Sequence, residues 1–125
     1  MHCGNLLLLI VAERPITFII ANFNPIWNSF IGTPPFPTYA SGHASFSGGI
    51  AKILSKGLKG SVAFTDSTKI PLGFAPRSFD NYEKAAKEAA VSRLYGGIHY
   101  TFDNDNGFNC SQIVAQNVLK DIHWK

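Results

Sequence analysis

The sequence predicts an all-α domain, and two observations lead to that prediction. Segments over residues 42–56 and 82–95 repeat apolar or small residues at three- and four-residue steps, the period of a helix with one buried face. A third helix is expected from about Gly107 to Ile122. No stretch alternates apolar and polar residues convincingly, as a half-buried strand would. The 125 residues are expected to form a single domain, residues 1–125.

The chain opens with an apolar run from Leu6 to Ala12, which we expect to be the tail of a buried helix. The run is far shorter than the about 20 residues that a membrane-spanning helix needs, and it lacks the basic flank of a signal peptide. Pro15 is expected to end or kink a helix at this point. Residues 22–41 are rich in proline and aromatic residues, which favours a packed functional loop over a tail.

The first clear helix is expected to begin after Ser41, whose hydroxyl suits an N-cap. A second connector follows over residues 57–79, punctuated by glycine and proline. Along the helix, apolar side chains return every three or four positions, as in an amphipathic helix. They are Phe46, Ile50, Ile53 and Leu54.

The helix over residues 82–95 gives the clearest pattern in the chain. Asp80 can cap it, and Glu83 completes the spacing of a capping box. Gly96 and Gly97 are expected to end it, because glycine commonly follows the last helical turn. In the last expected helix one stripe is formed by Ile113, Val114, Asn117, Val118 and Asp121.

Composition narrows the classes of function. The net charge is +3 and the basic residues are scattered along the chain, so no nucleic-acid partner is expected. No membrane span is expected either. The two cysteines, Cys3 and Cys110, show no disulfide-scaffold spacing, which favours two free thiols over a disulfide. The sequence does not define the oligomeric state and leaves an oligomer open.

One cation falls on the inward face of its expected helix. Small side chains form the inward stripe of residues 82–95, and Arg93 continues it, whereas Lys84 and Lys87 lie on the opposite face. A guanidinium stays charged, so a buried one requires an anion. The alternative is a structural salt bridge, or a side chain that extends from the last turn into solvent.

His43 stands in the first turn of its expected helix, on a stripe with apolar residues. A helix N-terminus offers unpaired N–H groups and the positive end of the helix dipole, and both favour a bound anion. Ser41 would add a hydroxyl, and Gly42 would let an anion approach the backbone. The alternative is a capping serine beside a core histidine that is hydrogen-bonded to a carbonyl.

His99 follows Arg93 by six residues and precedes Asp103 by four, so one helical turn would place the carboxylate beside the ring. Such a contact fixes the tautomer of a histidine and raises its basicity, which suits a ligand or a nucleophile. The alternatives are a surface His–Asp pair and a zinc site, which no ligand spacing supports. Taken together, one oxyanion site is predicted from Arg14, Ser41, Gly42, His43, Arg93 and His99.

These motifs resemble a known family. "SGH" at 41–43, "SR" at 92–93 and "HYTFD" at 99–103 are similar to the second and third signature motifs of the type 2 phosphatidic acid phosphatase superfamily. The longer segments around these motifs, "TPPFPTYASGHASFSGG" and "SRLYGGIHYTFD", are more similar to its vanadium-dependent haloperoxidase branch. The resemblance covers about Glu13 to Val118. It implies a partial helical bundle of the acid phosphatase/vanadium-dependent haloperoxidase type, namely its C-terminal catalytic part.

The resemblance also implies a role for each matched residue. His99 would be the ligand of the vanadium in vanadate, or the nucleophile that takes a phosphoryl group. His43 would be the acid–base group, and Asp103 would orient His99. The cofactor would be vanadate, or phosphate in the same site, and its oxygens would be held by Arg14, Ser41, Gly42 and Arg93.

One departure from the family pattern concerns its first motif, a lysine seven residues before an Arg-Pro pair. Leu7 occupies that position here, and we expect an N-terminally truncated member without this cation. The leading function is a haloperoxidase-like enzyme that uses vanadate to oxidise halide with hydrogen peroxide. An acid phosphatase that hydrolyses a phosphate ester through a phosphohistidine is the alternative. The third hypothesis is a non-catalytic oxyanion-binding domain or an incomplete fragment.

Overall fold

The computed structural model describes residues 12–58, 60 and 62–121, and in this part the chain is mostly helical. The predicted all-α, partial helical bundle is confirmed, with one small sheet added. The strands are β1 (Phe64–Asp66) and β2 (Arg77–Phe79), and a short 3-10 helix, η1 (Ile70–Leu72), lies between them. The helices are α2 (Pro15–Asn22), α3 (Gly42–Gly57), α4 (Tyr82–Tyr95) and α5 (Thr101–Asp121).

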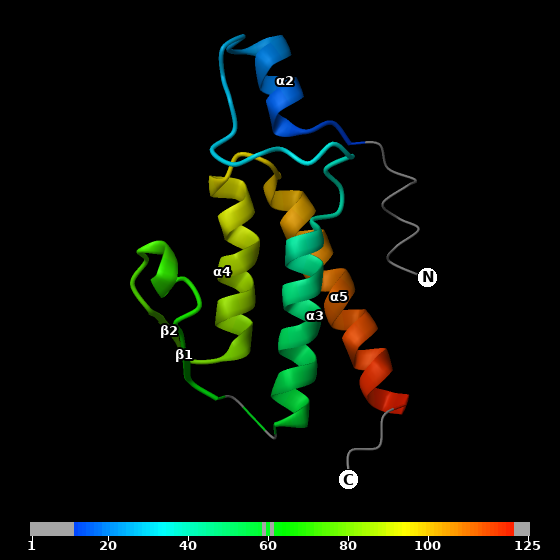
Figure 1. Cartoon of the computed structure of the whole chain (residues 1–125). Coiled ribbons are helices and arrows are strands. Elements are labelled where there is room, and N and C mark those ends of the chain that lie inside the picture. The colour runs from blue at the N-terminus through cyan, green and yellow to red at the C-terminus, as the bar shows by residue number, and fades with distance from the viewer. Residues whose placement is uncertain (1–11, 59, 61, 122–125) are drawn as a thin grey trace.

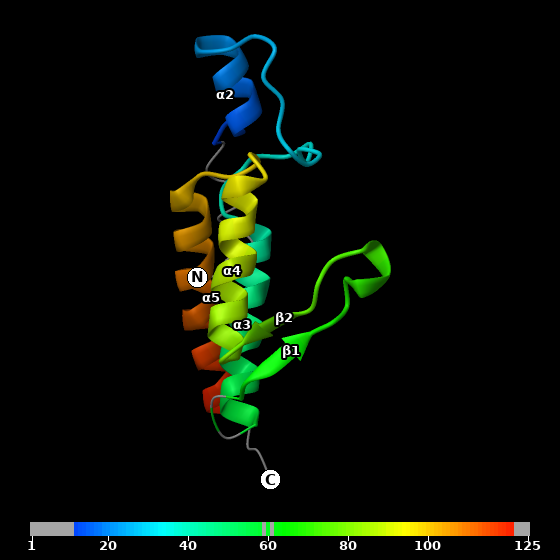
Figure 2. The same cartoon turned by 90° about the vertical axis from the view of Figure 1, so that its left-hand side faces the viewer.

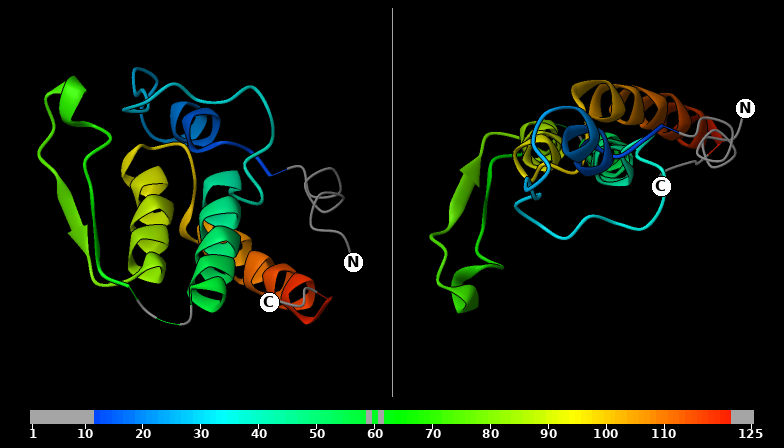
Figure 3. Two further views of the ribbon diagram at one scale, coloured as in Figure 1. Left: turned by 60° about the horizontal axis from the view of Figure 1, so that its bottom comes forward. Right: turned by 90° about the horizontal axis from the view of Figure 1, so that it is seen from above.

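Helices α3, α4 and α5 form the bundle (Figure 1). α3 packs against both of the others, and α3 and α5 run in one direction while α4 runs in the other (Figures 1 and 2). The start of α3, the end of α4 and the start of α5 therefore meet at one end of the bundle. Figure 3 shows α2 and the loop that follows it lying across this end. Segments far apart in the sequence are brought together there.

Small residues form the packed interior of the bundle. A Cβ added at Gly48 would lie 2.7 Å from Ser111 Oγ, and one added at Gly107 would lie 2.7 Å from the carbonyl oxygen of Ser41. These two glycines therefore allow α3 and α5 to approach closely, and the contact at Gly107 fixes the start of α3 against α5. The buried apolar residues of the three helices are Ala44, Ala51, Ala86, Ala90 and Ala115.

The larger apolar residues of α3 and α5 lie on the outside of the described chain. Phe46 is 76% exposed, Ile50 is 55% exposed and Ile113 is 64% exposed. Phe46 and Ile50 line an apolar groove of about 370 Å³ between α3 and α5. The apolar period thus predicts where the helices are, but alanine and glycine form the faces that pack. No helix in the described part of the chain is long and apolar enough to cross a membrane.

Pro15 begins α2, because a proline in the first turn lacks only an N–H that would have no partner there. The expected helix before Pro15 falls mostly outside the described residues. Two other helix ends differ from prediction. Asn81, not Asp80, caps α4, and its Oδ1 accepts from the N–H of Lys84 at 2.8 Å. α5 begins at Thr101, six residues before the predicted start at Gly107.

The connector between α3 and α4 contains an antiparallel hairpin that the sequence analysis did not predict. β1 and β2 are three residues each, too short to show an alternating pattern. Phe64 pairs with Phe79 across the strands, and the Phe64 ring stacks on that of Tyr82 at a centroid distance of 5.3 Å. Arg77 of β2 also pairs with Glu88 of α4 at 2.8 Å, so the hairpin lies against α4.

Cysteine pairing differs from expectation as well. Cys110 is disulfide-bonded, so the expectation of a free thiol is wrong for this residue. Cys110 lies half-buried in α5. The sequence did not indicate the bond, because only two cysteines are present and they are far apart in the chain. Cys3, Leu7 and the apolar run up to residue 11 lie outside the described residues, as does Ile122.

Candidate active site

The turn between α4 and α5 determines where His99 lies. Gly97 has a φ of 72°, which favours glycine, and a Cβ there would lie 2.9 Å from the Trp27 ring. A Cβ at Gly96 would lie 2.8 Å from Ile31 Cδ1. The loop that follows α2 thus packs directly on this glycine pair. His99 comes two residues after Gly97 and is only 5% exposed.

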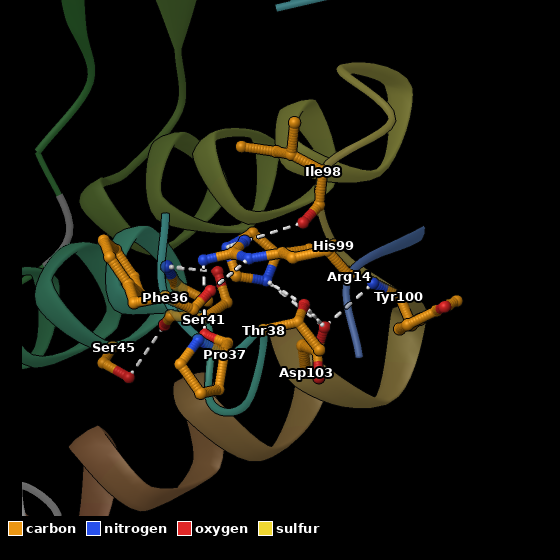
Figure 4. Close-up of polar contacts among 11 residues, drawn as sticks. Arg14, Phe36, Pro37, Thr38, Ser41, Ser45, Ile98, His99, Tyr100 and Asp103 are labelled. Carbon is orange, nitrogen blue, oxygen red and sulfur yellow. Dashed lines mark hydrogen bonds and ion pairs between the residues drawn. The ribbon is translucent and has the colours of Figure 1, made fainter. Parts of the chain in front are cut away.

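A buried polar cluster at the start of α5 holds the His99 ring (Figure 4). Its Nδ1 lies 3.2 Å from Asp103 Oδ2 and 3.0 Å from Thr38 Oγ1, and the Thr38 hydroxyl donates to the same carboxylate oxygen. That oxygen also accepts from the backbone N–H of Tyr100 at 3.0 Å. Burial alone would raise the pKa of Asp103, but the hydrogen bonds, led by that from His99, outweigh it and lower the pKa.

Arg14 reaches this cluster from the start of α2, where it is the N-cap residue. Its Nη1 donates to the carbonyl of Ile98 at 2.8 Å and lies 3.2 Å from His99 Nε2. Its Nε donates to the carbonyl of Phe36 at 2.8 Å, and its Nη2 donates to that of Pro37 at 3.3 Å. Arg14 therefore brings its charge to the site, while most of its N–H groups already bind backbone carbonyls.

Ser41 is fully buried at the start of α3. Its Oγ accepts from the N–H of Ala44 at 3.4 Å, as expected of an N-cap, and its own N–H donates to the carbonyl of Asp103 at 3.1 Å. The N–H groups of Gly42 and His43 lie in the first turn, where a helix has no internal acceptor. Since α5 starts at the same end of the bundle, two positive helix ends converge there.

His43 lies on the exposed side of the first turn of α3, and no hydrogen bond joins it to another described residue. Its pKa is lowered, first by partial burial, then by Arg93 and then by His99. Arg93 and His99 act on His43 because the three groups surround one region. The alternative of a core histidine bound to a carbonyl is wrong, since the residue is exposed.

Arg93 is half-buried on the last turn of α4, and its Nε is buried without a hydrogen-bond partner. Within the described residues it has no ion pair, so the alternative of a structural salt bridge has no partner there. Burial lowers the pKa of Arg93. The pKa of Arg14 is also lowered by burial, with Asp103 opposing the shift and the charge of Arg93 adding to it. The two guanidinium groups are therefore electrostatic neighbours.

This donor set fits an oxyanion. A buried N–H without an acceptor costs about 1–3 kcal/mol, so an anion beside Arg93 Nε would remove a penalty. First-turn N–H groups and guanidinium groups are the donors that vanadate or phosphate oxygens accept. Not every predicted ligand is equally free. Arg14 already donates to backbone carbonyls, and Ser41 Oγ already caps α3. Arg93 Nε and the N–H of Gly42 can still donate to an anion.

Thr38 is the site residue that the sequence analysis missed. It is fully buried and contacts both His99 and Asp103, yet it lies in an irregular loop before Ser41. No period marks such a residue. The available signal was a hydroxyl side chain among prolines and aromatic residues close to the "SGH" motif.

Comparison with known proteins gives consistent matches. The sequence matches the family model of the VCPO second helical-bundle domain over residues 17–124. The structure is similar to that of a bacterial vanadium-dependent iodoperoxidase, with 38% identity and a TM-score of 0.82, covering 88% of this chain and 27% of that chain. It is also similar to a holo-type bacterial vanadium-dependent chloroperoxidase, with 16% identity and a TM-score of 0.69, covering 82% and 28%.

The second of these likenesses shows the fold alone, because its identity is low. No curated protein matches the sequence. The chain spans 27% and 28% of the lengths of the two solved proteins. Because the family model matches most of the sequence, and the iodoperoxidase matches at 38% identity, the chain belongs to the vanadium-dependent haloperoxidase superfamily.

Proposed function

We propose that this chain holds vanadate in a vanadium-dependent haloperoxidase that oxidises halide with hydrogen peroxide. The observation that carries the proposal is the buried, unpartnered Nε of Arg93, which lies close enough to His43 to shift its pKa. Around it, cationic groups outnumber carboxylates, a charge balance that favours an oxyanion. A solved relative named as an iodoperoxidase supports halide as the substrate.

In this proposal His99 Nε2 is the atom that binds vanadium. Nδ1 is held by Asp103 and Thr38, so Nε2 has an electron pair to donate. Nε2 lies 3.2 Å from Arg14 Nη1, and the guanidinium would pass this hydrogen bond to an oxygen of the anion. Bound vanadate would supply a Lewis acid that activates hydrogen peroxide toward halide.

The remaining residues hold oxygens or move protons. Arg93 Nε has no hydrogen-bond partner among the described residues, and the N–H of Gly42 lies in the first turn of α3, where a helix has no internal acceptor. The Ser41 hydroxyl keeps its own hydrogen because its oxygen is the acceptor in the cap. His43 is exposed and its pKa is lowered, so it is largely neutral near pH 7 and can accept a proton from a reactant.

The test is halogenation of a phenolic dye by the purified chain with vanadate, iodide or bromide, and hydrogen peroxide. Turnover is expected to require vanadate and to be lost in His99→Ala. The matched control is Arg77→Ala, which removes an exposed arginine paired with Glu88 on the surface and should leave turnover unchanged. Absence of vanadate-dependent turnover, together with steady phosphate-ester hydrolysis without vanadate, would overturn the proposal.

Acid phosphatase is the second candidate. Two neighbouring guanidinium groups, Arg14 and Arg93, suit the equatorial oxygens of a phosphoryl group in transfer, and a nucleophilic His99 needs the same available Nε2. Hydrolysis of a chromogenic phosphate ester that persists in His99→Ala would exclude this function. Vanadate binding without either activity would instead indicate an oxyanion-binding domain.

A further inference from the structure

We propose that Thr38 is a positioning residue of this site, and that its hydroxyl holds His99 in the tautomer whose Nε2 donates an electron pair. The importance of Nε2 rests on the function proposed above, but the tautomer itself does not. Thr38 is fully buried in the loop before α3, and its Oγ1 contacts both His99 Nδ1 and Asp103 Oδ2.

The Thr38 hydroxyl has a single hydrogen to donate. An ionised carboxylate only accepts hydrogen bonds, so the hydroxyl hydrogen points to Asp103 Oδ2. Asp103 Oδ2 also accepts from the backbone N–H of Tyr100 at 3.0 Å, so this oxygen acts as an acceptor toward its neighbours. Thr38 Oγ1 therefore presents lone pairs to His99 Nδ1 at 3.0 Å. An unprotonated Nδ1 would face two acceptors, so Nδ1 carries the proton.

The opposite edge of the ring leads to the same tautomer. His99 Nε2 lies 3.2 Å from Arg14 Nη1, which can only donate. A proton on Nε2 would face another N–H, whereas a lone pair accepts from it. Each edge of the imidazole therefore favours a proton on Nδ1 and none on Nε2, and at Nδ1 the shorter of the two contacts is that of Thr38.

The loop segment that contains Thr38 also holds Arg14, the group at the opposite edge of the His99 ring. The carbonyls of Phe36 and Pro37 accept from Arg14 at 2.8 and 3.3 Å, and the next residue in the loop is Thr38. One short loop segment thus sets the position of the guanidinium at Nε2 and of the hydroxyl at Nδ1. Asp103 alone would hold Nδ1 less firmly, because its contact is longer, at 3.2 Å, and Oδ2 is shared with Tyr100.

The experiment measures the ring nitrogens of His99 by ¹⁵N NMR in the whole chain, with the signals assigned by their loss in His99→Ala. Wild type and Thr38→Ser are expected to show a protonated Nδ1 and an unprotonated Nε2. Thr38→Val removes the hydroxyl at nearly constant volume and is expected to give a mixture of both tautomers. Its affinity for vanadate should fall roughly 10-fold or more, as for other groups that orient a metal-binding histidine.

The matched control is Thr65→Val, because Thr65 is an exposed hydroxyl residue in β1 that bonds Ser78 far from His99. It should change neither tautomer nor affinity. A single Nδ1–H tautomer retained in Thr38→Val would overturn the inference. An Nε2–H tautomer in wild type would also overturn it, and that measurement does not depend on the folding of any variant. If Thr38→Val does not fold, Thr38→Ala takes its place.

The two proposals fail separately. Normal vanadate-dependent turnover with an unchanged tautomer in Thr38→Val would contradict the role of Thr38 and leave the haloperoxidase proposal intact. A tautomer shift in Thr38→Val, in a chain whose wild type binds no vanadate, would support Thr38 and contradict the vanadate site.

Discussion

The two sides of the site are built differently. On the His99 side, formed by His99, Asp103 and Thr38, every residue is at most 5% exposed and is hydrogen-bonded to the others. On the His43 side, formed by His43, Arg93 and the N–H of Gly42, one ring is exposed and one buried Nε has no partner. On the first side the ring nitrogens of His99 are both in contact with other groups, although Asp103 Oδ1 is buried without a partner among the described residues, whereas the second side has charge and N–H donors that bind no described group.

This difference separates two tasks of an oxyanion site. A ligand atom must be held in one orientation, which a buried hydrogen-bond network does well. Oxygens of a bound anion need donors that are not used elsewhere, and such donors make the free protein less stable. We therefore expect substitutions on the His99 side to lower stability, and substitutions on the His43 side to lower affinity.

The largest effect on stability is expected from Asp103→Ala. It removes the acceptor of three hydrogen bonds in a fully buried position, and the free energy of unfolding should fall by about 3–5 kcal/mol. Urea unfolding measures this loss. Asp105→Ala, an exposed carboxylate on the same helix, should stay within about 0.5 kcal/mol of wild type. Equal losses in the two variants would contradict a special network at Asp103.

Arg93→Ala is expected to act on binding instead. Loss of a charged donor should weaken vanadate binding about 10- to 100-fold, while the free energy of unfolding stays equal or rises because a buried, unpartnered Nε is removed. Calorimetric titration and thermal unfolding measure the two effects. Arg77→Ala is the control. A less stable Arg93→Ala with unchanged affinity would show that Arg93 is structural, and the distinction between the two sides would fail.

Gly107→Ala should disturb both sides by a smaller amount. Its Cβ would lie 2.7 Å from the carbonyl oxygen of Ser41, so α3 and α5 must separate there, at a cost of about 1–3 kcal/mol. The matched control is Gly49→Ala, whose nearest contact would be an ordinary 3.6 Å and whose helix propensity improves. Thermal unfolding should shift in opposite directions for the two variants. Equal shifts would contradict close packing at Gly107.

The smallest effect is expected in the pH dependence of stability. The pKa of His43 is lowered on folding, so the unfolded state binds its proton more readily, and stability should fall as the pH drops below about 6.5. His43→Gln should remove that part of the slope. Asp103 acts in a lower window, because its lowered pKa gives stability that is lost only as the pH falls below about 3.8. A slope unchanged in His43→Gln would contradict this assignment.

Much of the fold follows from local patterns in the sequence. The period of small and apolar residues predicts α3 and α4 to within one residue, and Ser41 caps α3 as expected. The start of α5 was missed because its first turns contain polar residues that the fold buries, such as Asp103 and Asn104. Helical periodicity also could not show which face packs, since glycine and alanine contribute little to an apolar pattern.

The candidate site was predictable where a residue type conflicts with its position. Arg93 on an inward face and His99 one turn before Asp103 are such conflicts, and the structure brings both to one end of the bundle. Thr38 shows no conflict, because a threonine in a loop is ordinary until the fold buries it. Its role depends on contacts made across more than sixty residues of sequence, which no local pattern carries.

The most direct test of the vanadate site is calorimetric titration of the purified chain with vanadate, in wild type and in His99→Ala. We expect wild type to bind one vanadate per chain, phosphate to compete for the site, and His99→Ala to bind vanadate far more weakly. Wild type without measurable binding, or His99→Ala with unchanged affinity, would contradict the vanadate site.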